Sequence, residues 1–108
     1  MQGADRNHLT AEEAQAALDE LRRQIDVLDL QILELLNRRA LVAARIGDVK
    51  KAAALPVYEP KREEEVFHNV TSNNGGPLSE SAVRRLFERI IDEMRLLQRE
   101  RLHKERER

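Results

Sequence analysis

The first half of the sequence holds an arginine at a position where an apolar residue is expected. Apolar residues recur there in alternating steps of three and four, and Arg39 takes the place between Leu35 and Val42. A guanidinium at a core position is costly unless it is paired or faces an anion. Arg39 is therefore a candidate anion-binding residue, and a local ion pair or a side chain extended toward solvent is the alternative.

Two more cations can be placed relative to Arg39 on a helix. Lys50 follows at nearly the same azimuth, about 16 Å along the axis, so the two long side chains could bracket a small anion. Taken alone, Lys50 is better explained as a solvated residue. Arg22 lies about 25 Å from Arg39 in the other direction and could reach the same anion only from an antiparallel partner helix.

A carboxamide interrupts a second apolar stripe near the end of the chain. Phe87, Ile91 and Met94 advance by four and then three residues, and the next step of four falls on Gln98. A buried amide must be hydrogen-bonded. Gln98 is therefore a candidate ligand donor, with capping of a neighbouring carbonyl or exposure beyond the core as the alternative.

Charged residues also open the expected middle helix. Arg62 and Glu63 lie in its first turns and follow Glu59, and a solvated ladder of charges explains this spacing better than a site does. The three histidines share no ligand spacing with one another or with acids, so we expect no metal site.

The composition narrows the classes of function. Lys plus Arg (19) nearly balances Asp plus Glu (20), which argues against nucleic-acid binding through the phosphate backbone. Without cysteine there is no disulfide, thiolate metal site or thiol nucleophile. The polar N-terminus lacks the apolar core of a signal peptide, and no apolar run could span a membrane. A cytoplasmic protein is the expectation.

Local signals divide the chain into three helices and predict an all-α fold. Thr10 and Glu13 form a capping-box pattern at the start of a helix over about 10–53. Pro60 can occupy the first turn of a second helix, because proline there loses no hydrogen bond. The turn "NNGGPLSE" follows, and Ser79 can cap a third helix.

The length of the first helix predicts a second subunit. It would extend roughly 65 Å, whereas a compact 100-residue domain has a radius of gyration of about 13 Å. We therefore expect an intertwined helical homodimer, whose long helices cover one another's apolar seams. The helical domain is expected over 10–103, with a flexible segment 1–9 before it and a charged tail 104–108 after it.

Four stretches together have the pattern of a known family. They are "LDELRRQID", "RRALVAARIGDVK", "PVYEPKREEEV" and "NNGGPLSESAVRRLFERII". From about Leu18 to about Gln98 the chain resembles the all-α class of chorismate mutases. The resemblance implies a dimer with two equivalent active sites built from both subunits. It also implies an isomerase that rearranges chorismate to prephenate on the route to phenylalanine and tyrosine. That pericyclic reaction needs no cofactor, so none is expected.

The same resemblance assigns roles to residues. Arg39 matches the in-chain arginine that grips a substrate carboxylate, and Arg22 the arginine donated to a carboxylate across the dimer. Lys50 and Gln98 match the two donors to the ether oxygen. Arg62 matches the arginine that supports the other carboxylate, and Glu63 the acid that meets the ring hydroxyl.

Two positions depart from the family pattern, and two other functions stay open. Glu59 stands where many relatives have aspartate, and Met94 stands where some have a serine that touches a carboxylate; methionine cannot donate that hydrogen bond. One alternative is an isochorismate pyruvate lyase on the same fold. The other is a non-catalytic dimerisation or regulatory module for a shikimate-pathway synthase, an association that the "NNGGPL" turn suggests.

Overall fold

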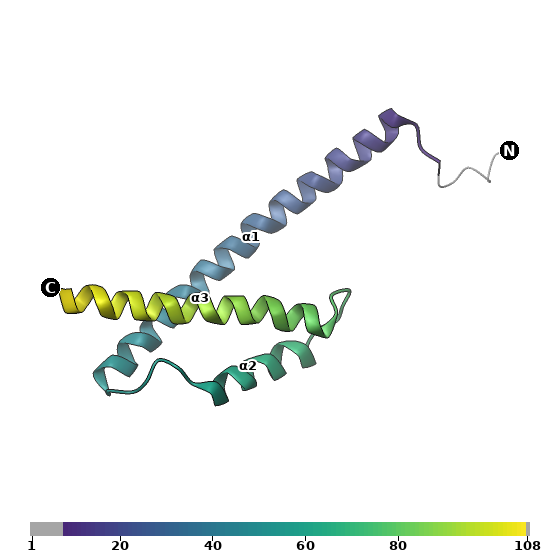
Figure 1. Cartoon of the computed structure of the whole chain (residues 1–108). Helices are drawn as coiled ribbons and strands as arrows, with labels where there is room; N and C mark the ends of the chain where they lie inside the picture. The colour runs from purple at the N-terminus through teal and green to yellow at the C-terminus, as the bar shows by residue number, and fades with distance from the viewer. Residues whose placement is uncertain (1–7, 108) are drawn as a thin grey trace. The chain divides into compact units, whose positions relative to one another are not determined.

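The protein is all-α over the part of the chain that the structure describes. The structure is a computed structural model that describes residues 8–107, with side chains described for 8–100. Its three helices are α1 (Ala11–Ala52), α2 (Pro60–Ser72) and α3 (Glu80–Glu107), and no strand occurs among the described residues (Figure 1). The predicted fold class and helix order are confirmed.

The sequence predicted a flexible segment 1–9 and a charged tail 104–108 on either side of the helical domain. Most of the expected flexible segment 1–9 lies outside the described residues, which begin at residue 8. Helix α3 continues to Glu107 and so includes most of the range 104–108. None of the described helices is both long and apolar enough to cross a membrane.

Helix α1 begins with the predicted capping box. The backbone N–H of Glu13 donates to Thr10 Oγ1 and that of Thr10 donates to Glu13 Oε1, each at 3.0 Å. These two bonds satisfy donors that the first turn of a helix leaves without a partner. Hydrogen bonds from the Thr10 backbone N–H, and secondly from the Thr10 side chain, lower the pKa of the Glu13 carboxyl because they stabilise its charged form.

Helix α1 ends in a Schellman motif with an unusual residue. The N–H of Leu55 donates to the carbonyl of Lys50 at 2.7 Å, and the N–H of Ala54 donates to the carbonyl of Lys51 at 3.2 Å. This pairing requires a left-handed residue, and here Ala54 adopts it with a φ of 56°. The turn reverses the chain directly after α1 ends, four residues beyond Lys50.

The starts of the other two helices follow the sequence signals. Pro60 occupies the first turn of α2, and Glu59 before it makes no side-chain cap. The N–H of Ala82 donates to Ser79 Oγ at 3.1 Å, so Ser79 caps α3 as predicted. The connecting loop contains the cis Gly76–Pro77 bond and Gly76 at a φ of 79°.

The chain divides into two compact units, residues 1–38 and 39–108. In the first unit the described helix has no core of its own. The seam residues are all exposed, by 43% to 58%: Leu18, Leu21, Ile25, Leu28, Ile32 and Leu35. A lone helix cannot bury its own apolar face, so this seam has no cover within the unit.

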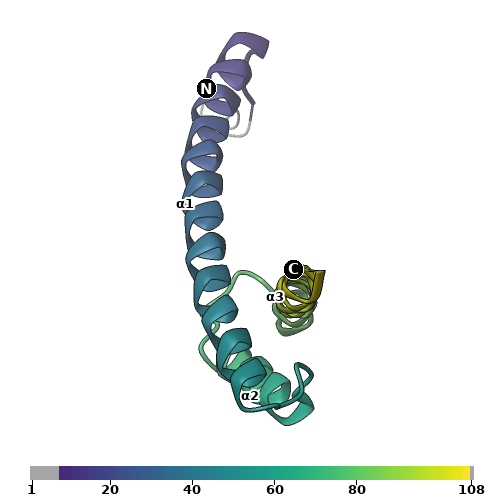
Figure 2. The same cartoon turned by 90° about the vertical axis from the view of Figure 1, so that its left-hand side faces the viewer.

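The second unit holds a small core. It comprises the end of α1 together with α2 and α3, which run side by side in opposite directions (Figures 1 and 2). The buried apolar residues come from all three helices: Ala43, Ala44, Phe67, Val83 and Ile91. Arg84 of α3 stacks over the Phe67 ring of α2, 4.3 Å from its centroid. These contacts fix the elements that carry the site.

Replacing Ala54 with glycine is expected to stabilise the protein. Glycine has no Cβ to clash at a positive φ, but it gives up more backbone freedom, so we expect a net gain of about 0.5–1 kcal/mol. Chemical denaturation at a fixed protein concentration measures this gain. Ala52→Gly, in the last helical residue, is the matched control and should destabilise. Equal destabilisation by both variants would contradict the assignment.

Candidate active site

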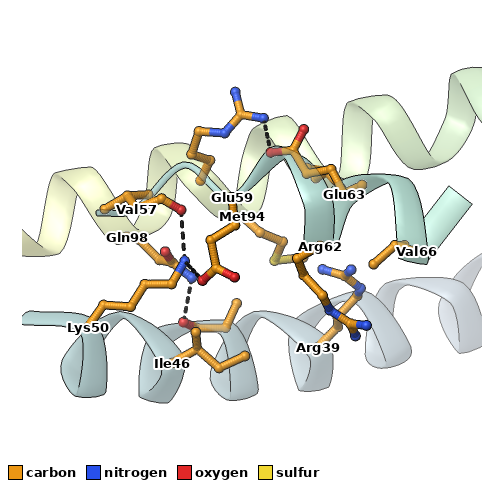
Figure 3. A pocket seen from close by; sticks show the side chains of 13 residues that line it. Arg39, Ile46, Lys50, Val57, Glu59, Arg62, Glu63, Val66, Met94 and Gln98 are labelled. Atoms are coloured by element: carbon orange, nitrogen blue, oxygen red, sulfur yellow. Dashed lines mark hydrogen bonds and ion pairs between the residues drawn. The ribbon is translucent and has the colours of Figure 1, made fainter. Parts of the chain in front are cut away.

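One cavity of about 130 Å³ gathers most of the polar residues that the sequence singles out. It lies within the unit 39–108, between the end of α1, the segment that follows it, α2 and α3 (Figure 3). Its lining comprises Arg39, Ala43, Ile46, Lys50, Val57, Glu59, Arg62, Glu63, Val66, Ile91, Met94, Arg95 and Gln98. Among the predicted site residues, Arg22 alone belongs to the other unit, where its side chain is exposed.

Lys50 is a buried cation with partners on the returning chain. Its residue is 8% exposed. Its Nζ donates to the Val57 carbonyl at 2.8 Å and pairs with Glu59 Oε1 at 2.7 Å. A buried ammonium needs such partners, and Glu59 supplies one with the carboxylate that does not cap α2. An ammonium has three N–H donors, so a further one remains for a ligand.

Gln98 of α3 is oriented by the backbone of α1. Its Nε2 donates to the Ala43 carbonyl at 2.8 Å, so the carboxamide binds a neighbouring carbonyl. The amide nitrogen has a second N–H that this bond does not use. Gly47 favours the close approach of the two helices, since a Cβ there would lie only 3.0 Å from Gln98 Cγ and the Gln98 side chain would have to shift. The Ala43 bond therefore sets which side of the amide faces the cavity.

Arg39 and Arg62 place two positive charges together. Figure 3 shows their guanidinium groups side by side. Burial lowers the pKa of Arg39, and the charge of Arg62 lowers it further. Among the described side chains none forms a hydrogen bond or ion pair with Arg39, whereas Arg62 makes one exposed pair with Glu65 at 3.5 Å. Guanidinium groups stay protonated, so this end of the cavity attracts an anion.

Arg95 lines the cavity and was not found from the sequence. One of its guanidinium nitrogens pairs with Glu63 Oε2 at 2.5 Å. Its guanidinium carbon also lies 5.0 Å from the centroid of the Tyr58 ring. The apolar stripe of α3 passes through the adjacent Met94, so periodicity alone gave no signal for Arg95. The contact with Glu63 joins two helices, and no local spacing predicts it.

Met94 contributes an apolar wall to the same cavity. It lines the cavity beside Arg95, and its thioether cannot donate a hydrogen bond. Met94 therefore adds no polar contact for a ligand.

The lining has two chemically distinct ends. Its charged side chains are four cations, Arg39, Lys50, Arg62 and Arg95, and two carboxylates, Glu59 and Glu63. Each carboxylate pairs with one cation, which leaves an excess of positive charge at the arginine end. The other end presents neutral and cationic N–H donors, suited to an oxygen that gains negative charge. No group of three or more His, Asp or Glu side chains placed to hold a metal ion occurs within the described part of the chain.

Comparisons with known proteins give a consistent result. The family model described as chorismate mutase type II matches residues 21–99. A bifunctional chorismate mutase/prephenate dehydratase of Aquifex aeolicus is 42% identical over 78 residues, covering 68% of this chain and 22% of that protein. A chorismate mutase of Methanocaldococcus jannaschii is 31% identical over 67 residues, covering 54% of this chain and 68% of that one. The chain thus spans about a fifth of the length of the bifunctional relative.

Solved structures agree with the sequence match. A chorismate mutase from Thermus thermophilus is 34% identical with a TM-score of 0.76, covering 77% of this chain and 94% of that one. A chorismate mutase from Helicobacter pylori in complex with prephenate is 27% identical with a TM-score of 0.77, covering 82% and 96%. The family match includes parts of α1 and α3, the whole of α2 and every predicted site residue. The chain belongs to the chorismate mutase type II family.

Proposed function

We propose that the chain rearranges chorismate to prephenate in the cavity of residues 39–108. The single observation that supports this most is the pair Arg39 and Arg62, two adjacent guanidinium groups of which the partly buried one has no acidic partner among the described residues. Chorismate is a dicarboxylate, and a guanidinium fork binds a carboxylate through two parallel hydrogen bonds.

The reaction asks two things of a protein. A carbon–oxygen bond breaks while a carbon–carbon bond forms within one molecule, so the flexible substrate must be held in its compact reactive conformation. Negative charge also develops on the ether oxygen in the transition state. A well-placed donor at such an oxygen typically contributes about 3–4 kcal/mol.

The two ends of the cavity match these two tasks. Arg39 and Arg62 hold carboxylate groups and so fix the conformation of the substrate. Lys50 and Gln98 donate to the ether oxygen, each already oriented by a protein carbonyl, that of Val57 or of Ala43. Glu63 accepts from the ring hydroxyl. Because the donors are held in place before the substrate arrives, little reorganisation accompanies the reaction.

The site also takes a residue from a second copy of the chain. Residues 11–38 have an exposed apolar seam, which continues in the second unit through Val42, Ile46 and Val49, exposed by 47% to 64%. A homodimer in which long helices pair would cover this seam and bring in the partner subunit's Arg22 as a further carboxylate ligand. Long paired helices explain both the length of α1 and its exposed leucines.

Incubation with chorismate is expected to yield prephenate, identified by chromatography. Arg39→Ala should lower kcat/KM by about 10²–10³-fold, because it removes an anion ligand from a partly buried site. The melting temperature should change little, since Arg39 makes no ion pair that folding depends on.

The matched control is Arg38→Ala, which removes an adjacent, exposed arginine outside the cavity lining. Its turnover should equal that of the unchanged protein. Release of pyruvate from isochorismate, without prephenate formation from chorismate, would indicate a lyase and overturn the proposal. Equal turnover with and without Arg39 would contradict its role.

Mixing two inactive variants tests the sharing of Arg22. Arg22→Ala and Arg39→Ala are each expected to be nearly inactive, because each dimer lacks one ligand at both sites. Refolding them together should restore about a quarter of the full activity, since about half of the dimers are mixed and each mixed dimer rebuilds one of its two sites. Chorismate consumption measures the recovery. No recovery from variants that still dimerise, as judged by sedimentation, would exclude donation across the interface.

The identity of Gln98 sets an expected pH dependence. A carboxamide donates at any pH, so kcat/KM should vary little between about pH 6 and 8. A glutamate at this position donates only when protonated, so turnover of Gln98→Glu should fall as the pH rises through the pKa of the new carboxyl. A pH–rate profile of both proteins checks this. A steep loss for the unchanged protein over the same range would argue against Gln98 as the donor.

A further inference from the structure

Arg95 and Glu63 form an unusually sheltered ion pair. Their side chains are 22% and 21% exposed, whereas in the exposed pairs of the described region, such as Arg89–Glu93, each side chain is at least 44% exposed. Both partners also line the cavity. An ion pair in a sheltered place interacts more strongly than one in water, so this contact has consequences for the site.

Several contacts fix the Arg95 head group. Besides Glu63 of α2, it reaches Asp92 on its own helix at 3.5 Å and lies 5.0 Å from the ring centroid of Tyr58. Tyr58 belongs to the segment that joins α1 to α2. The planar guanidinium can stack on a ring and bind a carboxylate at once, which an ammonium cannot do in the same way.

The orientation of the Glu63 side chain affects anion binding at the arginine end of the cavity. Glu63 follows Arg62 directly in α2, yet Figure 3 shows the two side chains pointing apart, Arg62 toward Arg39 and Glu63 away from both. A carboxylate turned the other way would compete with a substrate carboxylate for these arginines. The pairing with Arg95 gives Glu63 a partner on α3 instead.

We propose that Arg95 is a positioning residue that acts through Glu63. It holds the Glu63 carboxylate against α3, keeps it from pairing with Arg39 and Arg62, and so reserves those two guanidinium groups for the anionic ligand. This rests on the proposed function only in taking that ligand to be chorismate. The same contact keeps Glu63 in one orientation for the ring hydroxyl.

Steady-state kinetics with chorismate give the first test. Arg95→Ala should raise KM by about tenfold while kcat changes by less than about threefold, because the competing carboxylate weakens substrate binding. Adding Glu63→Gln to Arg95→Ala should return KM close to that of Glu63→Gln alone. Arg95→Lys, which keeps the charge but not the stacking, should lie between Arg95→Ala and the unchanged protein. The matched control Arg89→Ala removes an exposed ion pair from the same helix and should leave KM unchanged.

A ligand-free measurement separates this proposal from the proposed function. In Arg95→Ala the side-chain Nε–Hε resonances of Arg39 and Arg62 should shift as Glu63 turns toward them, and Glu63→Gln in that background should remove the shift. If the unchanged protein fails to convert chorismate, the proposed function fails while these resonances still decide the role of Arg95. Unshifted resonances, or an equal KM defect with and without the Glu63 carboxylate, would overturn the proposal and leave Arg95 a structural contact.

Discussion

The cationic side chains that α1 contributes to the cavity need partners for their charges. This requirement determines much of the structure of the unit 39–108. Lys50 is buried, and an isolated buried ammonium would be strongly unfavourable. The chain supplies its partners directly after the helix ends. The left-handed residue Ala54 reverses the backbone, and the returning segment brings the Val57 carbonyl and the Glu59 carboxylate to the Lys50 nitrogen. The turn after α1 and the uncapped start of α2 therefore together supply the partners that the buried Lys50 ammonium needs.

Arg39, on the same helix, is in the opposite situation to Lys50. Its pKa is lowered by burial and by the charge of Arg62, and the described unit gives it no acidic partner. The positive charge of Arg39 is thus balanced only when an anion binds. The favourable interaction of this charge is therefore available to the ligand and does not contribute to folding. In the proposed mechanism, interactions with a substrate carboxylate are similar in the ground state and the transition state, so they would hold and shape the substrate. Donation from Lys50 and Gln98 to the ether oxygen would strengthen as charge develops and so lower the barrier.

Local signals in the sequence predicted the fold well, because capping and turn formation depend on residues a few positions apart. The Thr10–Glu13 capping box, the proline at the start of α2 and the Ser79 cap all lie where they were expected. The left-handed Ala54 was not indicated, since no glycine marks it. Breaks in the apolar rhythm nominated Arg39 and Gln98, but the pairing of Arg95 with Glu63 joins helices distant in sequence, and periodicity carries no information about it. The role proposed for Arg22 depends on a second chain, so the structure of one chain does not test it.

The small side chains of α1 explain how the unit combines a modest core with a precise site. Ala43 and Ala44 are buried, and Gly47 leaves room for the Gln98 side chain against the helix backbone. Larger residues at these positions would bury more apolar surface and stabilise the unit, but they would separate α3 from α1. Gln98 reaches the Ala43 carbonyl only because the helices are close, and that bond sets the orientation of its amide. The small core of residues 39–108 therefore accompanies the close approach of α1 and α3 that orients Gln98. The apolar surface exposed on α1 would add stabilisation only where a second copy of the chain covers it, as in the proposed homodimer.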